Sequence, residues 1–285
     1  MNSLILSHWL CMLKTKLGDN IERCKEGAKM NGYHYQKYKD IDMNVMYKYP
    51  AKKILIIAPH PDDEIIGCGG TICKHIEEGD EVSVVYLTNG EKSINSCDYF
   101  VRKREAQMVA EYMGLNNIFF MELEDGNISV DSNHVNALRN IIYQIKPEVI
   151  CLPHIKEGHF DHYMSNILLY YVCNNVFLHM KILWYEVWTP IIPNILINIT
   201  DYIGKKEEVL EKYVSQISQY DYGELVYLSS RYKCLIYKCL LSQQYKEYKY
   251  RLNKKLKTKI PWTHYEAYYL MEYGKFISRV GYYIK

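Results

Sequence analysis

Apolar and polar positions alternate along the middle of the chain in blocks typical of parallel β-sheet proteins. Short, continuous apolar runs have the length and composition of strands buried on both faces. The predicted strands are 54–58, 81–87, 118–121 and 148–152. Longer amphipathic stretches follow them, and glycine or proline ends most of these stretches. The predicted helices are 64–78, 99–113, 133–145 and 162–176. Strands that alternate with helices through short links predict βαβ units and a mostly parallel sheet.

The rest of the chain extends this core on both sides. Two strand-like runs follow at 182–188 and 195–199, and residues 203–285 are interpreted as helices. An edge strand is predicted near 43–47. We therefore expect an α/β fold, three-layer α/β/α with a mostly parallel, Rossmann-like sheet and a helical C-terminal part. The expected organisation is an N-terminal extension at 1–50 followed by one domain at 51–285.

The first strand is followed by an unusual group of side chains. Two prolines end the strand, and His60, Asp62, Asp63 and Glu64 lie immediately around the second of them. Carboxylates beside a buried core cost several kcal/mol unless they are paired, hydrogen-bonded or bound to a metal. Ligands of open α/β sheets lie at the carboxyl ends of strands. The pattern therefore predicts a site, with His60 and Asp63 as one nitrogen and one oxygen ligand of a metal.

A second group of histidines lies after the strand at 148–152. The stretch Pro153–His162 contains three histidines and Asp161, whereas a catalytic zinc usually takes three protein ligands and a water. We expect the third ligand to come from this stretch. Taken alone, the stretch could equally be a polar loop with solvated histidines.

The two groups together carry a family resemblance. His60-Pro-Asp-Asp-Glu64 with His159-x-Asp-His162 resembles the LmbE-like family, which includes the PIG-L N-acetylglucosaminyl deacetylases. The resemblance runs from about Lys53 to Glu266, with Phe160 where the family commonly has proline. Supporting marks are Pro59, Gly67-x-Gly69-Gly70, Thr88-Asn89-Gly90, Arg102-x-x-Glu105, Leu123-Glu-Asp125-Gly126, Ser215-Gln216 and Glu266-Ala267.

The resemblance implies a zinc-dependent hydrolase that removes the acetyl group from an N-acetylglucosamine-type sugar or glycoconjugate. The implied metal ligands are His60, Asp63 and His162, and Fe²⁺ or Co²⁺ would suit the same donors as Zn²⁺. Asp62 is the implied general base, and His159, oriented by Asp161, would stabilise the oxyanion. Arg102 and Asp125 are the implied substrate contacts. Without the resemblance, the spacing of Arg102 and Glu105 indicates an ordinary surface ion pair, and Asp125 a turn residue.

Some features of the sequence suggest other classes of function. Gly67, Gly69 and Gly70 do not follow the strand directly, as a dinucleotide-binding loop requires, and are better explained by close packing of a helix on the sheet. A metal- and sugar-binding protein without hydrolytic activity, or an amidase for a non-sugar substrate, remains an alternative. A free carboxylate at Asp62 favours hydrolysis, since a pure binding site does not need a base beside the metal.

The composition limits the binding partners and the cellular location that we expect for the protein. The formal net charge is +2, which gives no general reason to expect nucleic-acid binding, and no apolar run is long enough to span a bilayer. The nine cysteines are scattered without a Cys-x-x-Cys pair, which favours free thiols and a cytoplasmic location. An apolar stretch within 1–17 predicts a helix that packs on the domain or on a second copy in a homo-oligomer. The basic run 246–259 is interpreted as solvated, with an anionic membrane or substrate as the alternative.

Overall fold

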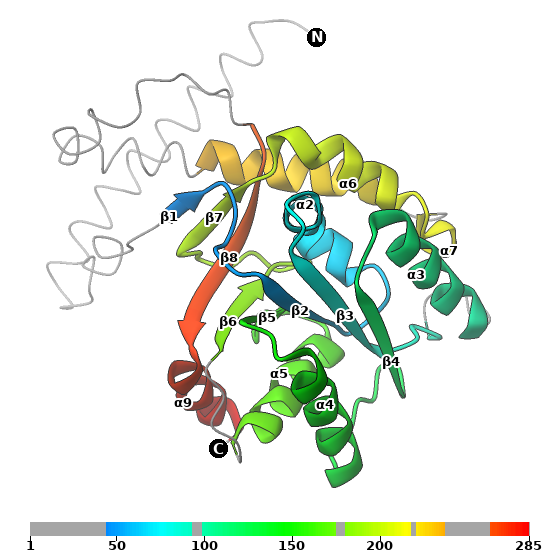
Figure 1. The fold of residues 1–285 in the computed structure, drawn as a ribbon, viewed down its shortest axis with the longest axis vertical. Coiled ribbons are helices and arrows are strands. Elements are labelled where there is room, and N and C mark those ends of the chain that lie inside the picture. Colours follow the sequence, from blue (N-terminus) through cyan, green and yellow to red (C-terminus); the bar gives the residue numbers. More distant parts are fainter. Residues whose placement is uncertain (1–43, 93–98, 175–179, 218–220, 237–262, 285) are drawn as a thin grey trace, which may run out of the picture. The chain divides into compact units, whose positions relative to one another are not determined.

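One eight-stranded sheet organises the described part of the chain (Figure 1). The computed structural model describes residues 44–92, 99–174, 180–217, 221–236 and 263–284. The strands are β1 Asn44–Met46, β2 Lys53–Ala58, β3 Glu81–Thr88, β4 Asn117–Leu123, β5 Val149–Pro153, β6 Lys181–Tyr185, β7 Ile195–Asn198 and β8 Tyr265–Glu272. Their order across the sheet is β1-β7-β8-β6-β5-β2-β3-β4. Strand β8 pairs antiparallel with both of its neighbours, and all the other pairs are parallel.

Helices cover both faces of the sheet and give the three layers that the sequence predicts (Figure 1). One face carries α2 Asp63–Glu77, α3 Tyr99–Met113, α6 Ile203–Leu210, α7 Val214–Ile217 and a helix at residues 222–236. The other face carries α4 Ser132–Ile145, α5 Phe160–Cys173 and α9 Tyr273–Ile284. Each face has its own apolar core.

Strand β2 shows why the central strands are continuous apolar runs. Ile54 and Ile56 point into the core under α2, while Leu55 and Ile57 point into the core under α4 and α5. Side chains alternate between the two faces of a strand, so a strand covered on both sides needs apolar residues at successive positions. Each fully buried aliphatic side chain contributes about 1.5–3 kcal/mol of transfer free energy.

The strand order places a crevice beside β2. From β2 the chain moves through β3 to β4 on one side, and then crosses back to β5 and β6 on the other side. The order β4-β3-β2-β5-β6 reverses between β2 and β5, and ligands of open α/β sheets bind at such a switch point, outside the carboxyl ends of the strands. Both of the motif loops singled out in the sequence follow these two strands.

Helix α2 lies very close to the sheet, as predicted from its glycines. A Cβ atom added at Gly67 would lie 2.2 Å from the ring of Tyr185 on β6, and one added at Gly70 would lie 2.6 Å from Ile199. Side chains at these positions would push the helix outward. The glycines therefore serve packing, which agrees with the interpretation preferred over a nucleotide-binding loop.

The interpretation of residues 203–285 as helices is wrong for β8. Residues Tyr265–Glu272 form a strand between β6 and β7. The segment mixes alanine, leucine, methionine and glutamate, which are good helix formers, with three tyrosines that favour strands. Burial between two existing strands decides the outcome, because a segment in that position satisfies two rows of backbone groups at once.

The edge strand predicted near 43–47 is confirmed as β1, which pairs with β7 inside the segment expected to be an extension. Residues 43–285 form one compact unit. The helix predicted within 1–17 and the basic run 246–259 lie outside the described residues. Among the described residues, no helix is long and apolar enough to cross a bilayer.

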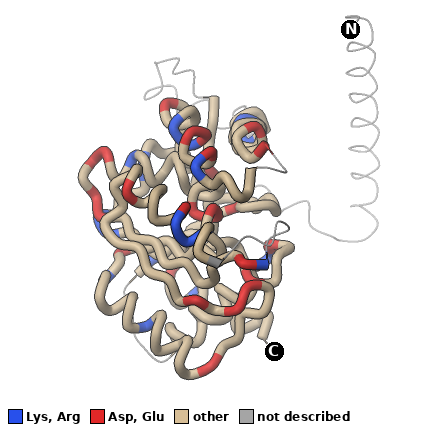
Figure 2. The backbone as a smooth tube through the Cα atoms, turned by 90° about the vertical axis from the view of Figure 1, so that its right-hand side faces the viewer, with Lys and Arg blue, Asp and Glu red and all other residues tan. Residues whose placement is uncertain are grey.

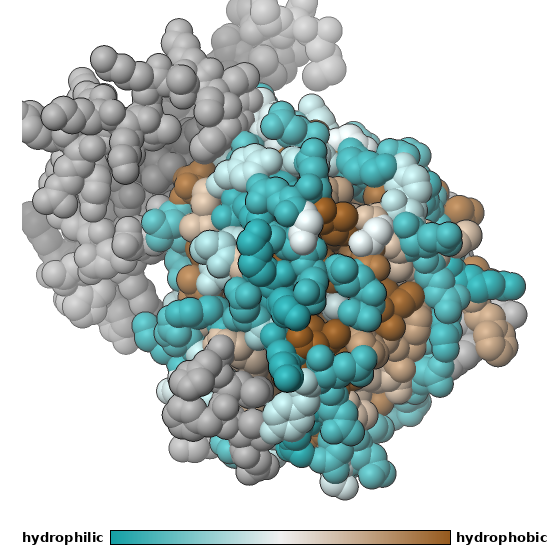
Figure 3. Space-filling model, viewed as in Figure 1, coloured by the Kyte–Doolittle hydropathy of each residue, from teal (hydrophilic) through white to brown (hydrophobic). Residues whose placement is uncertain are grey.

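Charged, polar and apolar residues are intermixed on the surface of the described part. Acidic and basic positions are interspersed along the described elements in Figure 2. The face drawn in Figure 3 is largely hydrophilic, with hydrophobic residues reaching the surface in separate patches. Large exposed apolar side chains of the described part include Trp188, Leu225 and Leu228.

Candidate active site

The three predicted metal ligands lie together at the switch point. His60 ends the loop after β2, Asp63 opens helix α2, and His162 lies in the first turn of α5. Oδ2 of Asp63 is 3.2 Å from Nδ1 of His60 and 3.2 Å from Nε2 of His162. All three residues are buried. The two motif loops therefore meet in the fold at one carboxylate.

Two of the three separations among these donor atoms suit a small divalent cation. Ligands about 2.0–2.1 Å from a tetrahedral zinc lie roughly 3.3 Å from one another, close to the two observed separations. Burial opposes ionisation of Asp63, but the charge and hydrogen bond of His162, together with His60, outweigh it and hold the pKa of this carboxyl far below its ordinary range. An ionised carboxylate between two imidazoles is a suitable ligand set. Among the described residues, two other groups have candidate donor atoms that all lie within 4.8 Å of one another: His60 with His159 and His162, and His60 with Asp125 and Asp161.

Two further carboxylates hold the far side of His60. Nε2 of His60 is 3.1 Å from Oδ2 of Asp161 and 3.2 Å from Oδ1 of Asp125. A proton on Nε2 would be shared with these acceptors, leaving Nδ1 free to bind a metal, as is common for metal-binding histidines. Burial lowers the pKa of His60, but the bonds to Asp125, Asp161 and Asp63 raise it well above the ordinary value.

This arrangement places two predicted site residues differently from expectation. Asp161 was expected to orient His159, but its carboxylate faces His60 and accepts from the amide of Gly126 at 2.7 Å. Asp161 touches His159 only through its own amide, which donates to Nδ1 of the imidazole at 3.1 Å. Asp125 was expected to contact a sugar, but it is buried and accepts from the amide of Lys92 at 2.7 Å.

His159 lies at the rim of the site. Its side chain is exposed, and its ring packs edge-on against His60 with centroids 4.7 Å apart. Burial and the nearby charges of His60 and His162 lower the pKa of His159. A neutral imidazole at the mouth of the site can face a bound substrate, as the resemblance implies.

Asp62 occupies a strained position next to the ligands. Its φ of 122° lies in a region that residues with side chains rarely adopt, and it caps α2 without a side-chain hydrogen bond to the helix. Such conformations cost about 1–3 kcal/mol and cluster at functional sites. Here the turn directs consecutive carboxylates to different partners: Asp63 to the histidines, and Asp62 to Nη2 of Arg102 at 3.0 Å.

The environment of Asp62 is that of a poised base. Burial raises the pKa of its carboxyl to about 7, with the charge of Arg102 opposing and that of Asp63 adding to the shift. Arg102 is itself buried and also donates to the carbonyl oxygens of Pro61 and Gly90. The ordinary surface ion pair considered for Arg102 and Glu105 is therefore wrong, since Glu105 is buried too and accepts from the amide and hydroxyl of Ser215.

Glu64 supports the strained turn from below. One carboxylate oxygen accepts from the amide of Asp62 at 3.1 Å, and the other accepts from the hydroxyl of Tyr213. Glu64 is fully buried, and burial raises the pKa of its carboxyl to about 7. These contacts give Glu64 a structural role. No pattern in the sequence singles out Tyr213, which lies two residues before the supporting mark Ser215-Gln216 and far along the chain from Glu64.

Sequence reasoning also missed Glu157. This buried carboxylate accepts hydrogen bonds from the consecutive amides of Val187, Trp188 and Thr189, at distances of 2.8–3.4 Å. It lies inside the second motif stretch, two residues before His159. The position of Glu157 among candidate ligands can be seen in the sequence. Its hydrogen-bond partners cannot, because they lie about thirty residues further on, after a different strand.

The fold and site together define an α/β domain with a histidine–carboxylate centre at the switch point of its sheet. Residues 55–171 match the family model described as PIG-L, GlcNAc-PI de-N-acetylase. This match spans both motifs and confirms the resemblance to the PIG-L (LmbE-like) family that they carry.

Curated and structural relatives agree with this assignment. A diacetylchitobiose deacetylase of Thermococcus kodakarensis is 31% identical over 129 residues, which are 41% of this chain and 48% of that protein. The chain thus spans about half of the length of this relative. The N,N'-diacetylchitobiose deacetylase of Pyrococcus horikoshii has a similar fold, with a TM-score of 0.60, 22% identity, and coverage of 86% of this chain and 90% of that chain. GalB of Pseudomonas putida, a 4-carboxy-2-hydroxymuconate hydratase, has a TM-score of 0.63 at 17% identity, covering 77% and 96% of the two chains. The fold therefore occurs with more than one reaction.

Proposed function

We propose that the protein is a metal-dependent N-deacetylase that hydrolyses the acetamide of an N-acetylglucosamine-type sugar or glycoconjugate. One observation carries the proposal: adjacent carboxylates are divided between two tasks. Asp63 lies between two histidines, as a ligand would, whereas Asp62 faces Arg102 and remains beside the ligand set, as a base would. The family assignment and the deacetylase relatives support this choice over other reactions known on the fold.

His60, Asp63 and His162 would hold the metal, which we propose to be Zn²⁺; Fe²⁺ and Co²⁺ suit the same donors. When bound, such an ion lowers the pKa of a water molecule and polarises an amide carbonyl. Asp161 and Asp125 keep His60 in the tautomer that presents Nδ1. The reaction in this proposal takes place in the cytoplasm, where buried thiols such as Cys68 and Cys151 would stay reduced.

The protein residues then manage the protons. Asp62 accepts a proton from the attacking water as the new C–O bond forms, and returns it to the nitrogen as the C–N bond breaks, so that acetate and a free amine leave. Arg102 fixes the position of the Asp62 carboxylate. His159, at the rim, would donate to the carbonyl oxygen as negative charge develops on it.

The test is acetate release from N-acetylglucosamine glycosides by chelator-stripped protein reloaded with Zn²⁺, Co²⁺ or Fe²⁺. Asp62→Asn should keep the metal yet lose turnover on the order of 10²–10⁴-fold, the usual contribution of a general base. Near-normal turnover in that variant would show that the base is another residue. If the protein binds the sugar but releases no acetate, it is a binding protein without hydrolytic activity. If it acts only on N-acetylated amino acids, it is an amidase for a non-sugar substrate.

A further inference from the structure

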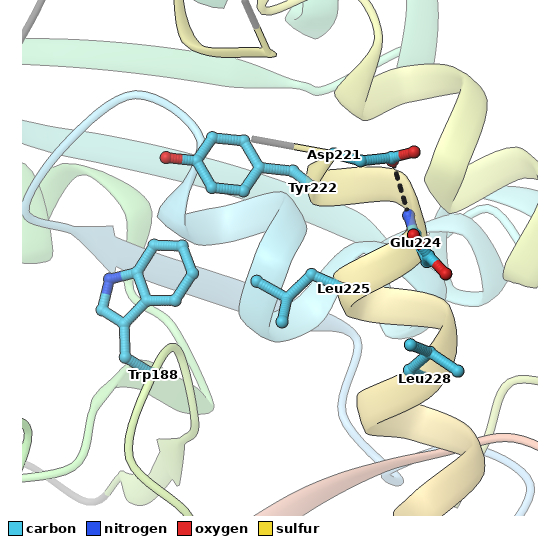
Figure 4. Close-up of a pocket in the computed structure, with 6 residues that line it drawn as sticks. All are labelled: Trp188, Asp221, Tyr222, Glu224, Leu225 and Leu228. Carbon is cyan, nitrogen blue, oxygen red and sulfur yellow. Dashed lines mark hydrogen bonds between the residues drawn. The ribbon is translucent and has the colours of Figure 1, made fainter. Parts of the chain in front are cut away.

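A hollow of about 560 Å³ lies between the β6–β7 loop and the helix at residues 222–236 (Figure 4). Its lining is Trp188, Asp221, Tyr222, Glu224, Leu225 and Leu228. The indole of Trp188 faces Tyr222, with ring centroids 5.6 Å apart, and Leu225 points into the space between them. The volume is within the range of small-molecule sites.

The hollow lies at the same edge of the sheet as the proposed active site. Strands β2, β5 and β6 are parallel neighbours, so the loops that follow them leave the sheet at the same edge. His60 follows β2, His159 follows β5, and Trp188 follows β6. The lining contains none of the proposed metal ligands, so a group bound there would leave the metal site itself free.

Both walls are held in place by buried polar contacts. Glu157 binds three successive amides of the β6–β7 loop, and Nε2 of His154 lies 2.7 Å from the carbonyl oxygen of Thr189. The loop is tied to the opposite wall by an ion pair between Glu186 and Lys233, 2.6 Å apart. The hollow is thus anchored to the same segment that carries His159.

Its chemistry is apolar with an acidic rim. Trp188, Leu225 and Leu228 are 46%, 42% and 54% exposed, so they present apolar surface that a ligand could cover. Asp221 and Glu224 lie at the edge of the hollow, and Glu207, Glu208 and Glu211 line the adjoining groove with them. The acidic side chains would repel an anionic ligand from this edge, whereas they would have little effect on the binding of a neutral, apolar one.

We infer that this hollow binds the aglycone of the substrate and selects an apolar, aromatic one. This inference rests on the proposed function, since the sugar to which the aglycone is attached must occupy the deacetylation site. Aromatic side chains supply large contact areas and favour offset or edge-on packing with another ring. Leu225 and Leu228 extend that surface along the helix.

The test compares acetate release from phenyl N-acetyl-β-D-glucosaminide, free N-acetylglucosamine, N-acetylglucosamine 1-phosphate and N,N'-diacetylchitobiose. The phenyl glycoside should have a kcat/KM about tenfold above that of the free sugar, as burial of a few CH₂-sized groups allows, with the phosphate slowest. Trp188→Ala and Leu225→Ala should remove the preference through KM and leave the rate on the free sugar unchanged. Leu235→Ala, an exposed leucine of the same helix outside the hollow, is the matched control and should keep the preference.

A binding measurement separates this inference from the proposed function. Phenyl β-D-glucopyranoside and its methyl analogue lack the acetamide and cannot be deacetylated. Calorimetry of these ligands with the metal-loaded protein therefore measures binding in the hollow without turnover. Tighter phenyl binding that is lost in Leu225→Ala supports the hollow even if no deacetylation is found. Equal binding of both glucosides, or diacetylchitobiose outperforming the phenyl glycoside, overturns the inference. The protein could instead prove to be a dimer that Leu225→Lys converts to a monomer without loss of the preference for the phenyl glycoside. That result would show that this surface is a contact between copies of the chain, and it would overturn the inference.

Discussion

The guanidinium of Arg102 donates to the carboxylate of Asp62 across 3.0 Å, and both side chains are buried. The same guanidinium binds carbonyl oxygens on either side of the site, so it fixes the base relative to two loops. A Cβ atom at Gly90 would lie 2.0 Å from Nη1 of Arg102, and the φ of +67° at Gly90 also favours glycine. The neighbouring loop is shaped to receive this side chain.

Arg102→Met should therefore lower kcat by on the order of 10²-fold, because a misplaced base costs about that much, while metal content stays at the wild-type level. The pH–rate profile should also shift, since Asp62 would lose the positive charge that opposes the effect of burial on its pKa. Lys103→Met removes a neighbouring cation that pairs with Glu122 and is the control. An unchanged pH profile in Arg102→Met would argue against the positioning role.

His162→Ala should abolish stoichiometric metal binding while most of the fold survives. The residue provides one of two imidazoles around Asp63, and a two-ligand site holds zinc poorly. Metal analysis after dialysis gives the readout, with His134→Ala, a partly exposed histidine on α4, as control. Full zinc occupancy in the His162→Ala protein would favour the grouping of His60 with Asp125 and Asp161.

Gly67→Ala should destabilise the protein by about 1–3 kcal/mol, the usual cost of forcing extra volume into a packed core. The new methyl group would overlap the ring of Tyr185, which β6 holds in place. Gly274→Ala in α9 is the matched control, because a Cβ atom there meets nothing within 4 Å. Urea denaturation should show a lower midpoint for Gly67→Ala and a change within about 1 kcal/mol for Gly274→Ala. Equal midpoints would mean that α2 can move away from the sheet.

Asp80 should make stability fall at acidic pH. Burial opposes its ionisation, but Lys48, Lys52 and His75 bind the carboxylate and hold its pKa below the ordinary range. An unfolded aspartate has a pKa of about 3.9, so this stabilisation is complete above about pH 4 and is lost as the pH falls towards the folded-state pKa.

The difference in urea midpoint between wild type and Asp80→Asn should thus be larger at pH 6 than at pH 3. Asp201→Asn, at an exposed aspartate, should show no such dependence. A constant difference in midpoint between wild type and Asp80→Asn across this range would mean that Lys48, Lys52 and His75 do not shift the pKa of this carboxyl.

The sequence was sufficient for the parts of the fold that depend on local pattern. The apolar runs of β2, β3 and β5 are readable because both faces of each strand are covered, and the helix limits follow from glycine and proline. The two motif loops could also be placed, since parallel strands end at a common edge. Strand β8 could not be predicted, because its composition favours a helix and it forms a strand only through pairing with neighbours on both sides.

The pairing of residues within the site could not be predicted in the same way. Asp161 faces His60 and not His159, because the fold brings the start of α5 next to the loop after β2, which no local spacing in the sequence indicates. The i, i+3 spacing of Arg102 and Glu105 suggested a surface pair because helical spacing says nothing about which face is covered. The partnership of Glu157 with the β6–β7 loop depends on two strands being adjacent, which only the folded sheet establishes.

The insertion of β8 has a consequence for the synthesis of the chain. Strands β6 and β7 leave the ribosome well before residues 265–272, yet each has an open edge until that late segment arrives between them. The emerging protein therefore carries two unpaired strand edges through the addition of several dozen residues, a period in which such edges can pair with other chains. Closing the sheet also joins positions that are distant along the sequence, which slows folding. Of the described strands, β8 is the last to be made and the one that completes the sheet, so chaperone protection should matter most just before it appears.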